Sequence, residues 1–363
     1  MNNILYTNKK FRSLEKKKLI KTFDSLWPLN RSLTGNDVRK THKIIGKILP
    51  LRTFEIKSLT KIHDWKVPLE WNVNKAYIKD SKGKTILDFK NNNLHLASYS
   101  ISFNGALTFQ ELKKKLFFIK KKPNAIPYKT LYYNNDWAFC ISYKNFKKLT
   151  NQRYYVFIDS SLKKGSMTIS DYLIPGKTKK EILVHTYTCH PSLANNELSG
   201  PITTTFLAKR IKNNYFSYRF IFAPETIGAI AYLKKFGKHL KKNLIAGYIC
   251  TCTGIDKFIT YKKSKRDNTL ADIFAIETLK EYKKFKINIK NFSPSGSDER
   301  QYCSLGYNLP VGSIMSKPYG EYPEYHTSLD KKKTINFSHL QKIIDFYFEV
   351  FCKFENKKKK FLK

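Results

Sequence analysis

The stretch Glu181–Ile211 reads EILVHTYTCHPSLANNELSGPITTTFLAKRI and sets the fold class. Residues 181–188 form an apolar run that predicts a buried strand, and residues 198–211 predict a helix, with Pro201 suited to its first turn. A polar loop that begins at His190 joins the two elements. Open α/β sheets place their chemistry at such points, where a buried strand gives way to a loop.

The alternation of strand and helix continues toward the C-terminus. Apolar runs predict further buried strands, and apolar residues at helical spacing predict the helices between them. Strands are expected at residues 218–222, 244–252 and 311–315, and helices at residues 227–236, 268–283 and 338–354. Residues 154–159 and 168–173 look like the two strands of a hairpin. The pattern implies an α/β fold with a mainly parallel central sheet and helices on both faces.

The segment 62–150 differs in composition and pattern from the residues on either side of it. Tryptophan, tyrosine and phenylalanine are frequent, and turn signals such as DSKG at residues 80–83 separate short apolar runs, which predicts short strands. We therefore expect two domains. The first is a discontinuous α/β domain of residues 1–61 and 151–363, and the second is an inserted β-rich domain of residues 62–150.

The net charge of +40 raises the question of a nucleic-acid partner. Lysine dominates over arginine, whereas readers of nucleic acid favour arginine for bidentate contacts. No RNA-binding aromatic signature or zinc-finger spacing is present. We therefore expect no specific nucleic-acid partner, only weak adhesion to polyanions at low salt. No run reaches about 18 uninterrupted apolar residues, so no membrane span is expected.

Cysteine usage bears on the compartment. The six cysteines are scattered and form no CxxC clip, so we expect reduced thiols in a cytoplasmic protein. A structural zinc held by four of them is the alternative. The segment Met1–Phe11 lacks the apolar core of a secretory signal, in agreement with a cytoplasmic location. The sequence leaves the oligomeric state open.

The loop after the first buried strand carries three candidate site residues. A histidine such as His190 can bind a metal through one ring nitrogen while the scaffold fixes the other; a hydrogen-bonded loop histidine is the alternative. Asn196 and Glu197 follow in the same loop. An acidic side chain there can complete a metal site or activate water, and capping of the next helix is the structural alternative.

Three later segments carry the other polar candidates. Glu225 ends the strand expected at residues 218–222, on a partly desolvated ledge that raises a carboxyl pKa toward the range of a general base; helix capping is the alternative. His326 lies among polar neighbours near the end of the chain. The polar loop Ser295–Arg300 can bind a carboxylate or phosphate through Arg300, or form a simple turn.

These motifs together resemble a known family. The chain is similar to the aminopeptidase-like proteins associated with polysaccharide biosynthesis, a branch of the zinc-dependent exopeptidase superfamily, over roughly residues 20–350. The motifs that carry the resemblance are RSLTG at 31–35, CHPSLANNELSGP at 189–201, PETIG at 224–228, GSDERQYC at 296–303 and YGEYPEYHTSLD at 319–330. The resemblance implies a peptidase-like α/β domain with a β-rich insertion near its start.

The resemblance also implies an active site. Di-zinc aminopeptidases use two histidines, a bridging aspartate, a glutamate and a second aspartate as ligands, beside a catalytic glutamate. His190 and His326 match the two histidines, and Glu225 matches the catalytic glutamate. Uncharged side chains stand where the ligand carboxylates are expected: Asn196, Thr226 and Thr251. An amide lacks the charge needed to bridge two dications.

The resemblance therefore favours one zinc ion over two. His190, His326 and an oxygen of Asn196 or Glu197 would be its ligands, and Glu225 would be the general base. The residues expected to bind the substrate are Asp298, Arg300 and Tyr325.

Three functions from different classes remain open. The first is a zinc-dependent, aminopeptidase-like hydrolase that cleaves an amide bond in a small peptide, an aminoacyl conjugate or an amino-sugar, in surface polysaccharide biosynthesis. The second is a catalytically inactive protein that binds a small ligand or glycan precursor, since three ligand carboxylates are absent. The third is a nucleic-acid-associated protein, on charge alone, whose binding would collapse in moderate salt.

Overall fold

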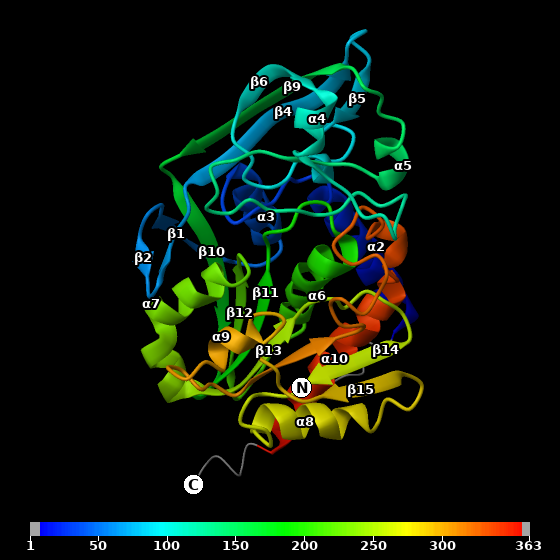
Figure 1. Cartoon of the computed structure of the whole chain (residues 1–363). Helices are drawn as coiled ribbons and strands as arrows, with labels where there is room; N and C mark the ends of the chain where they lie inside the picture. The colour runs from blue at the N-terminus through cyan, green and yellow to red at the C-terminus, as the bar shows by residue number, and fades with distance from the viewer. Residues whose placement is uncertain (1–7, 358–363) are drawn as a thin grey trace.

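The computed structural model describes residues 8–357 of the chain (Figure 1). Residues 1–7 and 358–363, which the sequence assigns to the two ends of the α/β domain, lie outside the described residues, as does most of the segment Met1–Phe11. Within the described part, no helix combines the length and the apolarity needed to span a bilayer.

A central sheet of eight strands has the order β1-β10-β12-β11-β13-β16-β14-β15. The neighbours β12, β11, β13 and β16 run parallel, whereas β10 is antiparallel to β1 and β12, and β14 is antiparallel to β16. The strands are β1 Arg52–Lys57, β10 Ser166–Ile174, β11 Glu181–Tyr187, β12 Ser217–Ala223, β13 Leu244–Cys250, β14 Phe258–Lys262, β15 Lys286–Lys290 and β16 Val311–Met315. The predicted α/β fold with a large central sheet is confirmed.

Helices cover both faces of this sheet, because alternate residues of its buried strands point to opposite sides. In β11, Ile182 and Val184 pack into one core and Leu183 into the other. The first core lies under α2 Lys9–Leu26, α3 Asn36–Gly46, α6 Ser199–Ala208, α8 Leu270–Leu279 and α10 Phe337–Asn356. The second lies under α7 Ile227–Asn243 and the short α9 Glu299–Tyr302. The helices α6, α7, α8 and α10 correspond to helices that the sequence predicts.

The C-terminal helix α10 illustrates why these segments become helical. The Asn336 side chain caps it by accepting hydrogen bonds from the first backbone N–H groups of the helix. Its buried residues recur at helical spacing and include Leu340, Ile343, Ile344, Tyr347 and Phe351. Full burial of each such side chain contributes about 1.5–3 kcal/mol, so the apolar stripe holds the helix against the sheet.

A second sheet, drawn above the central one in Figure 1, has the order β5-β4-β9-β6. Its strands are β4 Glu70–Asp80, β5 Thr85–Asp88, β6 Phe103–Thr108 and β9 Arg153–Lys163. Shorter elements surround it: the paired β2 Lys61–Ile62 and β3 Trp65–Lys66, the paired β7 Leu116–Phe117 and β8 Phe139–Cys140, η1 Asn93–His95, α4 Phe109–Lys113 and α5 Tyr143–Phe146. Since β9 is part of this sheet, the sheet takes in residues beyond 150. The proposed division at residues 62 and 150 stays a prediction.

The hairpin expected from residues 154–159 and 168–173 does not form. The first range lies in β9, which pairs with β4 and β6, and the second lies in β10, which pairs with β1 and β12. Apolar and aromatic residues mark both segments as strands, but this local pattern cannot tell which partners they take. Apolar side chains of both, such as Val156 and Ile169, share one core, which joins the two sheets.

The parallel strands determine where polar loops gather. The carboxyl ends of β11, β12 and β13 meet at one edge of the sheet. From there β11 leads to the π-helical turn η2 Ala194–Leu198 and β12 leads to the turn before α7. The loop after β16, which contains η3 Lys332–Thr334, returns to the same edge, because the backbone N–H of Ala194 donates to the carbonyl oxygen of Asp330. Crevices at this edge are where open α/β sheets bind ligands.

Candidate active site

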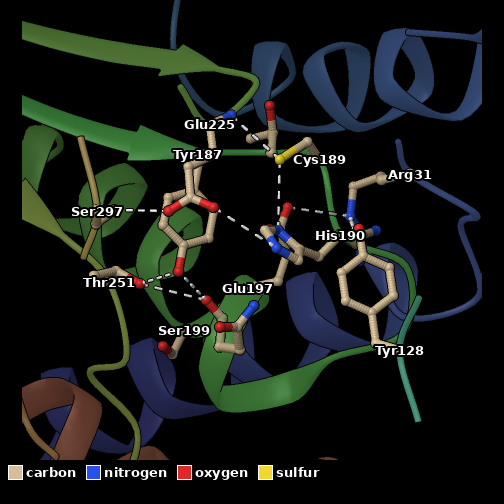
Figure 2. Close-up of polar contacts among 12 residues, drawn as sticks. Arg31, Tyr128, Tyr187, Cys189, His190, Glu197, Ser199, Glu225, Thr251 and Ser297 are labelled. Atoms are coloured by element: carbon tan, nitrogen blue, oxygen red, sulfur yellow. Dashed lines mark hydrogen bonds and ion pairs between the residues drawn. The ribbon is translucent and has the colours of Figure 1, made fainter. Parts of the chain in front are cut away.

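His190 lies just beyond β11, and its two ring nitrogens have different neighbours (Figure 2). The Nδ1 atom is 2.9 Å from a carboxylate oxygen of Glu197. The Nε2 atom is 3.8 Å from a carboxylate oxygen of Glu225. Because Glu197 accepts a hydrogen bond from Nδ1, it fixes the orientation of the ring and leaves Nε2 directed toward Glu225. This is the arrangement of a metal-binding histidine and its supporting carboxylate.

Glu197 is fully buried and faces a buried arginine. The Nε atom of Arg31 is 3.5 Å from a Glu197 carboxylate oxygen and donates a 3.0 Å hydrogen bond to the carbonyl oxygen of His190. Burial lowers the pKa of Arg31. Burial is the largest influence on the pKa of His190 and acts to lower it, but the hydrogen bond with Glu197 and the negative charges of Glu197 and Glu225 together outweigh burial, so this pKa lies above its ordinary value. Removal of any member of this group leaves a buried charge uncompensated.

Glu225 follows β12 and is held at both its backbone and its side chain. Its backbone N–H donates to the Cys189 sulfur at 3.2 Å, and Ser297 donates a 3.0 Å hydrogen bond to one carboxylate oxygen. The Glu225 side chain is 27% exposed, so it reaches the solvent side of the sheet edge. Burial raises its pKa above the ordinary carboxyl value. A carboxyl group with a raised pKa is suited to accept and return a proton near neutral pH.

The backbone turn at Thr226 is strained and clamped. Its φ of 63° is in the left-handed region, which costs a β-branched residue on the order of 1–3 kcal/mol. The Thr226 N–H donates to an Asp298 carboxylate oxygen at 2.7 Å, and its hydroxyl accepts from an Arg300 guanidinium nitrogen at 3.0 Å. Asp298 and Arg300 therefore act one residue away from Glu225, where they hold the turn that presents it.

His326 comes from the loop between β16 and α10 and is held in a different way. Its carbonyl oxygen accepts a 2.8 Å hydrogen bond from the backbone N–H of Tyr128. Its ring stacks on Tyr325 with centroids 4.0 Å apart, and its centroid lies 5.5 Å from that of His190. The Tyr128 ring contacts both histidines: its centroid lies 5.1 Å from that of His190 and 5.2 Å from that of His326. Burial lowers the pKa of His326 to about 3, so its imidazole is neutral.

Asn196 is fixed through its backbone. Its N–H donates to Asp330 at 2.9 Å and its carbonyl oxygen accepts from the Tyr187 hydroxyl at 2.8 Å. The same hydroxyl contacts the Thr251 hydroxyl at 2.5 Å. The side-chain nitrogen of Asn196 is buried and has no hydrogen-bond partner among residues 8–357. Neutral hydrogen bonds among Tyr187, Asn196 and Thr251 thus lie beside the bond to Asp330 in this part of the site.

A cavity of about 730 Å³ opens over these residues. His190, Glu225 and His326 line it together with Cys189 and Arg300. Aromatic residues from outside the central sheet form another part of the lining: Trp65, Tyr128, Tyr132, Tyr133 and Phe292. Its volume is in the range of small-molecule sites.

The structure thus brings most of the predicted site residues together. His190, Glu225, His326 and Arg300 line the cavity, while Glu197, Asn196 and Asp298 are buried beside it and Tyr325 stacks on His326. Sequence reasoning singled out no role for four residues that contact them: Arg31, Tyr128, Cys189 and Ser297. Arg31, Cys189 and Ser297 fall within the motifs of the resemblance, which was the available signal. Nothing local marks Tyr128.

The donor set fits zinc chemically. Imidazole nitrogen and carboxylate oxygen are common zinc ligands. Catalytic zinc sites have three protein ligands and leave the fourth coordination position open for water or substrate. The Nε2 atom of His190 is oriented by Glu197, and His326 is neutral at ordinary pH, as a ligand must be. Cys189, His190 and Glu197 also have potential ligand atoms within 4.8 Å of one another. The residues present therefore fit a metal ion.

The fold and site define an aminopeptidase-like α/β protein. The chain belongs to the family described as a domain of unknown function, DUF4910, whose profile matches residues 20–357. A curated relative from Clostridium acetobutylicum, named as a polysaccharide biosynthesis protein with an aminopeptidase-like domain, is 44% identical over 336 residues, which is 92% of this chain and 76% of the relative.

Solved structures agree. A crystal structure of a protein assigned as a peptidase from Clostridium acetobutylicum has a TM-score of 0.91 at 41% identity, covering 96% of this chain and 83% of its own. The zinc aminopeptidase BSAP from Bacillus subtilis has a TM-score of 0.65 at 11% identity, covering 92% of this chain and 94% of its own. A peptidase M28 precursor from Shewanella amazonensis has a TM-score of 0.61 at 12% identity, with 96% of both chains covered. The last two show the shared fold.

Proposed function

We propose that this protein is a zinc-dependent hydrolase that cleaves an amide bond. The observation that carries the proposal is the convergence of His190, His326 and Glu225 on one cavity, with the second ring nitrogen of His190 already engaged by Glu197. That engagement leaves Nε2 available on the cavity side. The similarity to zinc aminopeptidases in fold supports the same conclusion.

We further propose a single zinc ion. His190 and His326 would hold it, with an oxygen from Asn196 as the third protein ligand and Glu197 as the support of His190. The uncharged side chains of Asn196, Thr226 and Thr251 support one ion, because two adjacent dications need bridging negative charge. Zinc in such a site supplies a Lewis acid and makes water nucleophilic at neutral pH.

Glu225 is proposed as the general base. Its carboxylate takes a proton from water as the water oxygen bonds to the amide carbonyl carbon, and it returns that proton to the nitrogen as the C–N bond breaks. Ser297, which donates to one carboxylate oxygen, keeps the other directed into the site. The Asp298 and Arg300 clamp on Thr226 prevents the turn from relaxing. Correct positioning matters because a misplacement of about 1 Å can cost roughly a hundredfold in rate.

A second function, ligand binding without catalysis, is favoured by one observation. Neutral hydrogen bonds among Tyr187, Asn196 and Thr251 occupy a region where di-zinc aminopeptidases carry charge. A site of this kind can keep its shape and bind a glycan precursor. A role in surface polysaccharide biosynthesis is supported by the name of the curated relative. A cytoplasmic location is supported by six cysteines that are all free thiols.

The test combines metal analysis with a substrate panel. The wild-type protein is expected to hold close to one zinc per chain and to hydrolyse at least one aminoacyl or N-acyl amide. Glu225→Gln should keep the zinc and lose about 10²–10⁴-fold in kcat. Glu277→Gln, at a half-buried carboxylate on α8 that pairs with Lys357, is the matched control and should keep wild-type zinc content and activity. Metal-free protein that neither binds added zinc nor turns over any amide would overturn the proposal in favour of ligand binding.

A further inference from the structure

The charges that line the cavity are unusual for a site that receives an amine. Among the described residues of the lining, Glu225 provides the one carboxylate, whereas Lys265 and Arg300 provide cationic side chains. Asp298 lies behind the Thr226 turn, is fully buried, and is not part of the lining. The lining is therefore cationic apart from the proposed base.

A substrate with a free α-ammonium group needs carboxylates to replace its water. A buried ammonium without such a partner is strongly destabilised. Glu225 is already engaged by Ser297 and lies beside His190. Among the described residues of the lining, Glu225 is thus the one carboxylate with which an ammonium group could pair.

Arg300 has donors to spare for an anion. One of its terminal nitrogens donates to the Thr226 hydroxyl at 3.0 Å. Its Nε has no hydrogen-bond partner within the described part of the chain but is buried, so the donors that a ligand in the cavity can reach are those of the terminal nitrogens. A guanidinium presents five N–H donors in a planar fork that matches carboxylate and phosphate geometry. Lys265 is exposed and lines the same cavity, where it adds positive charge without a fixed geometry.

The lining also contains exposed apolar surface. Trp65 and Tyr133 are 36% and 53% exposed, with ring centroids 6.2 Å apart, and Leu305 is 90% exposed. The Tyr133 hydroxyl donates to the carbonyl oxygen of Lys66, which fixes its ring beside Trp65. Exposed aromatic faces of this kind pack against flat rings and the apolar faces of sugars. The cavity is therefore built for a ligand with a ring and a negative charge.

We propose that the substrate is an N-acylated compound that has no free amine at the scissile bond, carries a carboxylate or phosphate that Arg300 and Lys265 bind, and packs a ring on Trp65 and Tyr133. This inference rests on the proposed amide hydrolysis. It narrows that reaction to deacylation: water adds to the acyl carbon, the C–N bond breaks, and the nitrogen leaves as an amine with the proton from Glu225. An N-acyl amino acid and an N-acyl sugar phosphate share this chemistry.

The test uses substrates matched in size and different in charge. N-acetyl-L-phenylalanine is anionic, N-acetyl-L-phenylalanine amide is neutral, and L-phenylalanine amide is cationic at neutral pH. The anion should exceed the neutral compound in kcat/KM by roughly ten- to a hundredfold, as expected for charge-assisted hydrogen bonds, and should exceed the cation by more. The ratio of kcat/KM for N-acetylglucosamine 1-phosphate to that for N-acetylglucosamine tests in the same way whether the anion is a phosphate.

Three variants test whether Lys265 and Arg300 cause the preference for anionic substrates. Lys265→Met, at an exposed position, should reduce kcat/KM for the anions several-fold and leave the neutral compound within twofold of wild type. Arg300→Met should remove most of the preference, and Arg300→Lys should restore part of it. Because Arg300 also holds Thr226, its effect is judged by the ratio of anionic to neutral substrate, which a general loss of structure would not change.

The outcomes separate this inference from the proposed function. Faster cleavage of L-phenylalanine amide than of either acetylated compound would overturn the inference and keep the hydrolase. If no compound is cleaved, the affinities of N-acetyl-L-phenylalanine and L-phenylalanine amide, measured by calorimetry, test the recognition of the anion separately from hydrolysis. Tighter binding of the anion, weakened by Lys265→Met, keeps the recognition and overturns the hydrolase. Equal binding of both overturns the inference.

Discussion

The two histidines of the site are held by different kinds of structure. His190 follows a central strand and is fixed by buried charge, through Glu197 and Arg31. His326 lies in a long loop and is fixed by neutral contacts, through stacking on Tyr325 and a backbone hydrogen bond from Tyr128. One half of the site is therefore built into the sheet, and the other depends on packing from outside it.

The contacts of the His326 half come from the segment proposed as an insertion. The Ser328 N–H donates to the Ile126 carbonyl oxygen at 2.9 Å, the Ile126 N–H donates to the Ser328 hydroxyl at 3.0 Å, and Pro127 and Thr327 form a β-bridge. Residues about 200 positions apart thus pair directly. The comparison teaches that the β-rich segment completes the site as a structural part and is more than a cover over it.

The largest expected effect comes from breaking the buried charges of the His190 half. Arg31→Met should lower the free energy of unfolding by about 3–5 kcal/mol, because it leaves the Glu197 carboxylate buried with His190 alone. Urea denaturation at pH 7.5 measures this. Arg266→Met, at an exposed position, is the control and should change stability by less than about 0.5 kcal/mol. Equal stability of the two variants would show that the buried arginine does not support this half.

Removing the aromatic support of the His326 half should have the next largest effect. Tyr128→Ala should cost about 3 kcal/mol of stability through lost packing and weaken zinc binding roughly ten- to a hundredfold, because the ring contacts both histidines. Tyr128→Phe is the control: its hydroxyl contacts only the Tyr132 hydroxyl, at 3.1 Å, among its described side-chain partners, so the change should be under about 1 kcal/mol. Unchanged zinc affinity in Tyr128→Ala would separate the tyrosine from the site.

The His190 half should also respond to acid through a histidine beneath it. His42 is hydrogen-bonded to Ser170 and Thr188, and burial lowers its pKa to about 3. Because the unfolded chain binds this proton near pH 6.5 and the folded protein does not, stability is complete above pH 6.5 and falls as the pH drops toward 3. The loss from this group should be about 2 kcal/mol at pH 5.

His42→Gln tests this assignment. The variant cannot take up the proton, so the difference in unfolding free energy between pH 7.5 and pH 5 should shrink by about 2 kcal/mol relative to wild type. Denaturant titrations at the two pH values measure it. The same pH dependence in variant and wild type would contradict the assignment and point to other buried groups.

The smallest effect should come from the exposed rim of the His326 half. Lys122 donates a hydrogen bond to the carbonyl oxygen of Pro323 at the surface. Lys122→Met should cost no more than about 0.5 kcal/mol, since solvent screens exposed polar contacts, and zinc affinity should stay unchanged. A loss as large as that of Tyr128→Ala would mean that the rim, and not the aromatic ring, holds this half of the site.

Much of the fold and of the candidate site was predictable from the sequence. The apolar run before His190 and the helical spacing after it are local signals, and they are strong enough to give the α/β pattern. The motifs also single out His190, Glu225 and His326, and they reveal the uncharged residues at Asn196 and Thr251. The hairpin prediction, which was wrong, shows the limit: the apolar and aromatic residues in 154–159 and 168–173 identify strands but not their partners.

The sequence by itself therefore determined most of the strands and helices of the α/β pattern, the candidate residues and the uncharged side chains at Asn196, Thr226 and Thr251. The tertiary structure alone decided that Glu197 engages Nδ1 of His190, that Asp298 and Arg300 clamp the Thr226 turn, and that Tyr128 packs against both histidines. The physical reason is the separation along the chain of the residues that interact. Periodicity and capping act between neighbours in the chain, whereas ring orientation and charge pairing depend on distances between segments that only the packed fold brings together.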